Sequence, residues 1–118
     1  MDAAQRTAEA LTAEVSQADG VGRIALAGQL DRTGEATLMD AYARATADGP
    51  SAIDIDFAGV DYINSTGIAL VVRVLAEARK DGRAVRAHGL TEHYRQIFTI
   101  TRLSDFMTIV GDEEVDER

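Results

Sequence analysis

The feature that most constrains the fold is the segment 53–74, where the spacing of apolar residues changes from that of a strand to that of a helix. In its first part, IDIDF at 53–57, apolar residues alternate with aspartates, and this period of two predicts a strand with one buried and one solvent-exposed face. Asp54 and Asp56 are expected on the exposed face. From position 68 the apolar residues follow helical spacing, namely Ile68, Val71, Val72 and Leu75. This stripe predicts a helix that packs against the sheet.

The turn between strand and helix reads Asn64-Ser65-Thr66-Gly67. Its side-chain oxygens are of the kind that accept hydrogen bonds from the unpaired amides of a first helical turn, so the helix is expected over about 66–80. Ser65 is thus expected at the mouth of the helix, where free amides and the helix dipole stabilise an anion such as a phosphate. Two interpretations follow: Ser65 is a phosphorylation site that alters the surface, or it is only a helix cap.

Further segments predict the rest of one small domain. The turn Ala18-Asp19-Gly20 joins expected strands at 11–15 and 22–27 into a hairpin. A helical stripe follows at Leu38, Ala41, Tyr42 and Ala45, and further strands are expected at 52–57, 84–88 and 106–110. We therefore expect an α/β fold with a single small mixed sheet of about four to five strands covered by helices. Residues 1–110 would form this domain, and the acidic segment 111–118 a disordered tail.

The turn, with its flanking strand and helix, resembles the STAS domain, the fold of the bacterial anti-sigma factor antagonists, whose phosphorylatable serine lies in a D-S-S-G or D-S-T-G turn. The segment IALAGQLD at 24–31 resembles the family's strand ending in G-E-L-D, and DFAGV at 56–60 resembles its D-L-S-G-V. Residues 89–104 are similar to the segment that closes such domains. The resemblance covers about residues 12–110 and implies a STAS-like fold.

By this resemblance, Ser65 matches the phosphorylated serine. The phosphorylated members usually carry Asp immediately before that serine, whereas this chain has Asn64, which keeps hydrogen-bonding capacity but lacks the charge. Asp31 and Asp56 match acids near the phosphoserine turn, where they would add like charge beside a phosphate. The residues that the resemblance places at the partner-binding surface are Asp31, Asp56, Asn64, Ser65, Thr66, Gly67 and Ile68.

The resemblance implies a regulatory function. The unphosphorylated protein would bind an anti-sigma factor that is also a serine kinase, and so regulate sigma-dependent transcription. Phosphorylation of Ser65 would release that partner, and a phosphatase acting on phospho-Ser65 would reset the protein. Two alternatives remain open: a constitutive STAS subunit of a stress-signalling or lipid-transport assembly, and a nucleotide or small-ligand sensor that uses the Ser65 turn as an anion cradle.

Composition and motifs weigh against several other classes. The net charge of −8 argues against nucleic acid and anionic membranes as partners. The chain has no cysteine and its first 15 residues resemble neither a secretory signal nor a membrane span, so a cytoplasmic location without membrane insertion is expected. No motif ties His88 or His93 to Ser65, so no enzyme and no cofactor are expected.

Four aspartates are candidate metal ligands: Asp31, Asp54, Asp56 and Asp61. Asp54 and Asp56 share one strand face, whereas Asp31 and Asp61 are expected in loops, and the spacing of an EF-hand is missing. We therefore expect no metal site.

Overall fold

The computed structural model describes residues 10–111, which form a five-stranded sheet with the order β1-β2-β3-β4-β5. The strands are β1 (Thr12–Ala18), β2 (Val21–Leu30), β3 (Ala52–Ile63), β4 (Ala84–His88) and β5 (Thr108–Val110). β1 is antiparallel to β2, and the remaining neighbours are parallel. The prediction of a small mixed sheet covered by helices is confirmed. The acidic tail lies outside the described residues, apart from Gly111.

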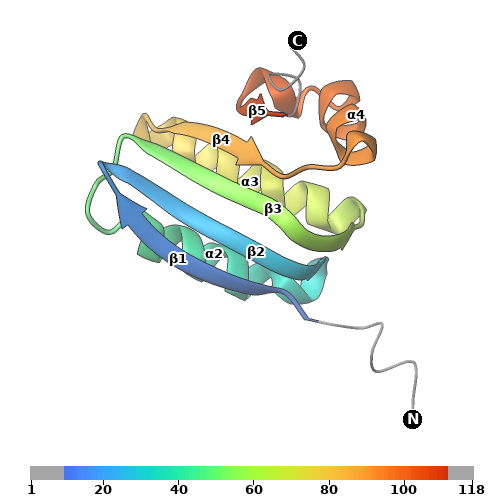
Figure 1. Ribbon diagram of the computed structural model, residues 1–118, viewed down its shortest axis with the longest axis horizontal. Coiled ribbons are helices and arrows are strands. Elements are labelled where there is room, and N and C mark those ends of the chain that lie inside the picture. Colours follow the sequence, from blue (N-terminus) through green and yellow to red (C-terminus); the bar gives the residue numbers. More distant parts are fainter. Residues whose placement is uncertain (1–9, 112–118) are drawn as a thin grey trace.

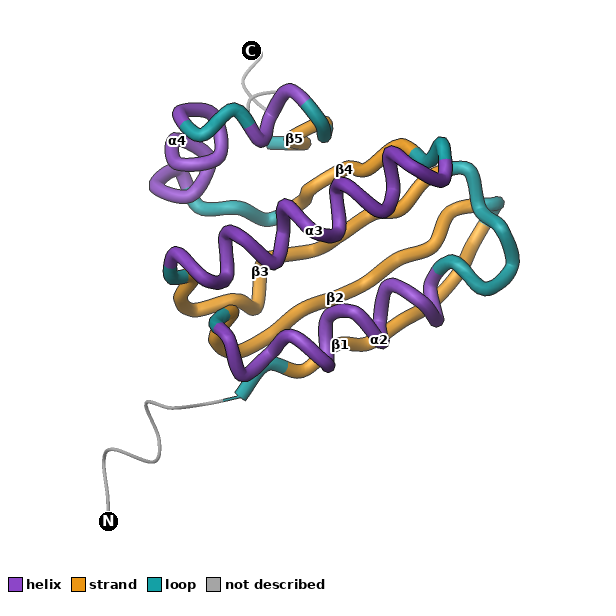
Figure 2. The backbone as a smooth tube through the Cα atoms, turned by 180° about the vertical axis from the view of Figure 1, so that it is seen from behind, coloured by secondary structure: helices purple, strands orange, loops and turns teal. Residues whose placement is uncertain are grey.

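Three helices and two short 3₁₀ turns connect the strands: α2 (Glu35–Ala45), α3 (Ser65–Asp81), α4 (Glu92–Ile100), η1 (Arg32–Gly34) and η2 (Leu103–Asp105). α2 and α3 lie side by side on one face of the sheet, behind it in Figure 1 and in front of it in Figure 2. α4 and η2 lie beyond β4, next to β5 (Figure 1). None of the helices between residues 10 and 111 has the length and apolar character needed to span a bilayer.

The first two strands form the predicted hairpin. Asp19 and Gly20 both have positive φ, 56° and 79°, the backbone conformation that a two-residue turn between twisted strands requires. The paired region runs from Thr12–Ala27 to Ala18–Val21, so both strands are longer than their apolar cores suggest.

β3 is six residues longer than predicted, because the expected strand ended at Phe57 and the observed one ends at Ile63. Pairing with β2 is interrupted after Asp56 by an irregularity and then resumes at Gly59. A Cβ at Gly59 would lie 2.8 Å from the carbonyl oxygen of Leu26, so a glycine allows the two strands to approach there. The expectation that Asp61 lies in a loop is wrong, since it lies within β3.

The core lies between the sheet and its helices, and its largest fully buried side chains are Ile24, Leu30, Leu38, Ile53, Ile55, Val74 and Phe98. The stripe predicted for α3 is only partly correct. Val71 and Leu75 are buried, but Val72 is 45% exposed, and Leu70 and Val74 face the core instead. An apolar helix offers two overlapping stripes, and packing on the sheet selects between them.

The opposite face of the sheet carries paired charges, and it corrects the expectation for Asp54. Asp54 is only 9% exposed although it lies on the face away from α2 and α3. The parallel register places it opposite Arg86, whose guanidinium donates to both carboxylate oxygens at 2.5 and 3.1 Å. This hydrogen bonding raises the pKa of Arg86 above its usual value. Paired in this way, Asp54 can be buried.

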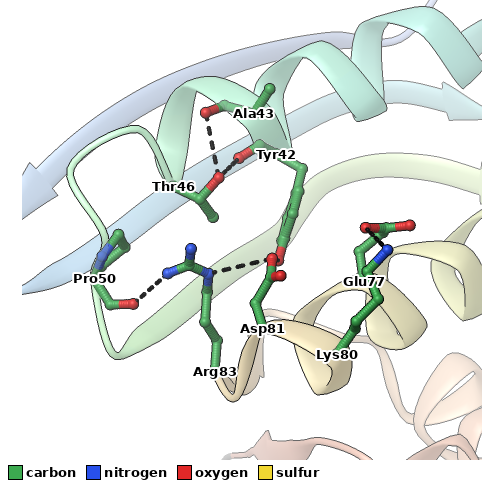
Figure 3. A network of polar contacts seen from close by, with 8 residues as sticks. All are labelled: Tyr42, Ala43, Thr46, Pro50, Glu77, Lys80, Asp81 and Arg83. Carbon is green, nitrogen blue, oxygen red and sulfur yellow. Dashed lines mark hydrogen bonds and ion pairs between the residues drawn. The ribbon is translucent and has the colours of Figure 1, made fainter.

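A polar network joins the helices at the end of the molecule where α3 finishes (Figure 3). The hydroxyl of Tyr42, on α2, donates to Asp81 at 3.2 Å. Arg83 lies 3.8 Å from the same carboxylate and donates to the carbonyl oxygen of Pro50 at 2.6 Å. Burial is the main cause that raises the pKa of Tyr42. The network therefore holds together α2, the loop before β3 and the end of α3.

Candidate functional site

The turn from β3 into α3 is the candidate site, and Asn64 organises it. Asn64 has an extended backbone, and its side-chain oxygen accepts the N–H of Gly67 at 2.8 Å, while its carbonyl oxygen accepts the N–H of Ile68 at 2.9 Å. This is the geometry of an N-cap residue. Ser65 is the first residue of the helix. The interpretation of Ser65 as the cap is therefore wrong, because Asn64 has that role.

Ser65 and Thr66 are both exposed on the first turn of α3. Their amides belong to the positions for which an α-helix provides no internal acceptor. Unpaired amides and the positive end of the helix dipole favour a negative charge at this place. The hydroxyl of Ser65 thus lies at a position where a phosphate would be accommodated without disturbing the core.

Gly67 is the residue of the turn that packs against the end of β2. It is buried, and a Cβ at this position would lie 2.0 Å from the carbonyl oxygen of Leu30. That carbonyl also accepts the N–H of Asn64 at 3.3 Å. The helix start therefore rests directly on the end of β2. Gly67, predicted at the partner-binding surface, makes this close approach possible, whereas the half-buried Ile68 is partly accessible.

Asp31 lies beside the turn, since it follows Leu30 directly. Its carboxylate accepts the N–H of Thr33 at 3.0 Å and the hydroxyl of Thr33 at 2.6 Å, and so caps η1. Asp31 is half-buried, so part of its charge remains accessible at the end of β2, whose Leu30 carbonyl contacts Asn64. This placement agrees with the expectation of an acid close to the turn.

Asp56 lies elsewhere. The register places it opposite Ala25 on β2 and His88 on β4, whereas the turn follows the pair Leu30–Ile63. Five steps along β2 correspond to about 17 Å. The Asp56 carboxylate accepts from Arg23 at 3.2 Å and from the N–H of Ala58 at 2.9 Å, so it stabilises the irregularity in β3. The expectation that Asp56 lies beside the serine turn is therefore wrong.

Two tyrosines near the turn were missed by the sequence analysis. Tyr62, on β3 two residues before Asn64, is 50% exposed. The hydroxyl of Tyr94, on α4, accepts the N–H of Ile63 at 2.9 Å. A strand extended to Ile63 would have indicated Tyr62, but nothing in the sequence indicates a contact between residues 31 positions apart. The turn is thus held by β2 on one side and by α4 on the other.

The two histidines lie in other surroundings. The Nε2 of His88 is 3.4 Å from the Asp54 carboxylate on the open face of the sheet. His93, in the first turn of α4, packs its ring against Tyr94 with centroids 4.9 Å apart. Among residues 10–111, no group of three acidic, histidine or cysteine side chains is arranged to hold a metal ion.

Comparison with protein families and curated proteins gives one consistent result. The family model described as "Mlab, STAS domain" matches residues 13–111. The anti-sigma-F factor antagonist RsfB of Mycobacterium tuberculosis is 28% identical over 78 residues, 66% of this chain and 62% of that protein. The chain thus covers less than two thirds of the length of RsfB. The anti-sigma-B factor antagonist of Staphylococcus epidermidis is 26% identical over 106 residues, 90% of this chain and 98% of that protein.

Solved structures show the same architecture. An anti-sigma factor antagonist from Mycobacterium paratuberculosis is 25% identical, with a TM-score of 0.67 and coverage of 85% of both chains. The Bacillus cell fate determinant SpoIIAA in its phosphorylated form is 19% identical, with a TM-score of 0.65, and the match covers 88% of this chain and 96% of that one.

Proposed function

The chain belongs to the STAS domain family, and from this membership we propose that it is an anti-sigma factor antagonist switched by phosphorylation of Ser65. In its unphosphorylated form it binds an anti-sigma factor that is also a serine kinase, and phosphorylation of Ser65 by that kinase releases it. A phosphatase acting on phospho-Ser65 restores binding. It acts as a regulatory binding protein and not as an enzyme.

One observation carries this proposal: Asn64 caps α3, so the hydroxyl of the exposed Ser65 is left available for modification. The names of the two relatives support the antagonist function. SpoIIAA, which has the same fold, has been solved in a phosphorylated form, and this supports a switch by phosphorylation.

The switch has a simple physical basis. The partner would cover Ser65, Thr66, Ile68 and the accessible part of Asp31, with Tyr62 as an aromatic contact at the edge. A phosphate adds a charge of about −1.5 to −2 in the middle of this surface. The helix dipole stabilises that charge in the free protein, whereas docking would desolvate it close to Asp31. Phosphorylation therefore weakens binding and leaves the fold intact.

The test uses the full chain with Ser65→Ala and Ser65→Asp as parallel baits in lysate of the native cell, followed by calorimetry with the captured partner after purification. We expect the Ala protein to bind and the Asp protein to bind more weakly by more than about tenfold, because like charge at an interface costs several kcal/mol. Ser16→Asp, an exposed serine on β1, is the matched control. Mass spectrometry after incubation with the partner and ATP should place one phosphoryl group on Ser65. Equal binding by both Ser65 variants contradicts the switch.

A second candidate is a constitutive subunit of a larger STAS-containing assembly. It is favoured by the neutral Asn64, which replaces the usual Asp without loss of the cap. In that case both Ser65 variants retain the same partner, and no phosphoryl group appears on Ser65 after incubation with ATP and that partner.

A further inference from the structure

A groove of about 320 Å³ lies between α3 and the segment that joins α4 to β5. Figure 2 shows these two parts of the chain next to each other on the helical side of the molecule. The groove is lined by Val72, Leu75, Ala76, Arg79, Thr101, Arg102, Leu103 and Phe106. It lies along α3, two helical turns and more beyond Ser65, and the proposed switch does not use it.

The groove exposes apolar side chains that a folded domain usually buries. Val72 is 45% exposed and Phe106 is 50% exposed. The guanidinium of Arg79 lies over the Phe106 ring, 5.3 Å from its centroid, so the aromatic wall carries a positive charge at its rim. A ligand for this groove would combine apolar and anionic groups.

The charge of the groove contrasts with that of the whole chain. Its lining contains two arginines and no acidic residue, although the chain carries a net charge of −8. Arg102 pairs with Asp105 at 2.7 Å, next to the groove, but its side chain remains 78% exposed. Acidic side chains therefore have two accessible cations to meet here.

We propose that this groove binds the chain's own acidic segment 112–118. That segment, DEEVDER, has five carboxylates, one guanidinium and a single apolar residue, Val115. The segment follows Gly111, which is five residues after Phe106 in the sequence, so these two residues are at most about 17 Å apart. A chain of seven residues spans about 23 Å when extended, which is enough to reach the groove. The groove exposes the apolar side chains Phe106 and Val72 beside the cations Arg79 and Arg102. The composition of the segment, carboxylates around one valine, is complementary to this lining.

The test exploits the absence of cysteine in the chain. A spin label on Arg118→Cys in the full-length ¹⁵N-labelled protein broadens the amide signals of residues near the tail. We expect selective broadening at Val72, Ala76 and Phe106. It should fall about threefold in high salt, or when the five tail acids are changed to Asn and Gln, because both weaken the attraction. Phe106→Ser and, as a milder variant, Arg79→Gln should each reduce it. Ile100→Ser, an exposed apolar residue outside the groove lining, should not.

Three outcomes overturn the proposal: broadening of the groove that is unchanged by neutral tail acids, broadening equal at Ile100 and Phe106, and unchanged broadening in Arg79→Gln. A mixture of ¹⁵N-labelled protein without a spin label and spin-labelled ¹⁴N protein shows whether the segment in the groove belongs to the same chain or to a second copy. Broadening of the groove in that mixture as strong as in the singly labelled protein would mean that a second copy occupies it, which also overturns the proposal.

Discussion

At the start of α3, Asn64 caps the helix and Ser65 presents an exposed hydroxyl. Because Asn64 closes the first turn through Gly67, the Ser65 hydroxyl contributes little to the stability of α3. Asn also lacks the charge that the family's usual Asp carries at this place. The helix start is therefore held by a neutral cap, and none of the four turn residues carries a charge unless Ser65 is phosphorylated, as we propose.

Replacement of Asn64 should show that this residue, and not Ser65, stabilises the start of α3. We expect Asn64→Ala to lower the free energy of unfolding by about 1 kcal/mol, since the N–H of Gly67 loses its acceptor. Asn64→Asp keeps the acceptor and adds a charge that the helix dipole favours, so it should raise stability by about 0.3–1 kcal/mol at low salt. Urea unfolding measures both changes. Ser65→Ala serves as the control, and a cost as large as that of Asn64→Ala would show that Ser65 shares the cap.

Gly67 is the other residue on which the turn depends. A Cβ there would lie 2.0 Å from the Leu30 carbonyl oxygen, so Gly67→Ala must move the start of α3 away from β2. We expect a loss of about 2 kcal/mol or more, in the range of overpacked core sites. Thr66→Ala, one residue earlier and exposed, should stay within about 0.5 kcal/mol in the same urea titrations. A mild effect of Gly67→Ala would mean that the turn can shift.

At the scale of elements, sequence patterns predicted the helices and turns that depend on residues close together in the sequence. The type and approximate position of α3 followed from its turn residues and apolar spacing, and the hairpin followed from Asp19-Gly20. The extension of β3 to Ile63 did not, because its pairing with β2 resumes only after an irregularity that the partner strand accommodates. The burial of Asp54 depends in the same way on Arg86, 32 residues away on another strand.

The candidate site shows the same contrast between features encoded by neighbouring residues and features that depend on distant contacts. Ser65 and Thr66 lie in the first turn of α3, as the contiguous turn motif predicts, and their role in partner binding stays a prediction. Tyr94 was not predicted, because its contact with Ile63 exists only when α4 packs beside the end of β3. Likewise, Val72 belongs to an apolar stripe in the sequence, and its exposure follows only from which face of α3 packs against the sheet.

The contact between α4 and β3 should affect the turn directly. Tyr94→Phe removes the acceptor of the Ile63 N–H and leaves that group buried without a partner, at a cost of about 1–3 kcal/mol. Hydrogen exchange of the Ile63 amide, followed by NMR, should become faster than in the unmodified protein. Tyr62→Phe, a matched change on an exposed ring close by, should alter neither exchange nor stability. Unchanged exchange in Tyr94→Phe would show that α4 does not hold the turn.

At the scale of the whole molecule, the two ends of α3 differ: the first carries the candidate binding surface, and the second is held by a polar network. The end with the Ser65 turn presents exposed hydroxyls, an accessible acid and an aromatic ring. The opposite end of α3 is fastened by Tyr42, Asp81 and Arg83, which join both helices to the loop before β3 (Figure 3). A charge added at the first end acts on a helix that is anchored at the second, so we expect the proposed phosphorylation of Ser65 to change the surface without loosening the domain.

Tyr42, in the polar network at the end of α3, is expected to make the stability of the whole domain sensitive to alkaline pH. Burial raises the pKa of Tyr42 above its ordinary value near 10, so the folded protein holds this proton more tightly than the unfolded chain does. The contribution is fully present below pH 10, where both states are protonated, and is lost as the pH rises from 10 through the folded-state pKa. Urea unfolding at a series of alkaline pH values should show this fall. Tyr42→Phe should be less stable at neutral pH, because the hydrogen bond to Asp81 is absent, but should show a smaller fall above pH 10. An equal fall in both proteins would place the alkaline sensitivity in other groups and leave Tyr42 as a packing residue alone.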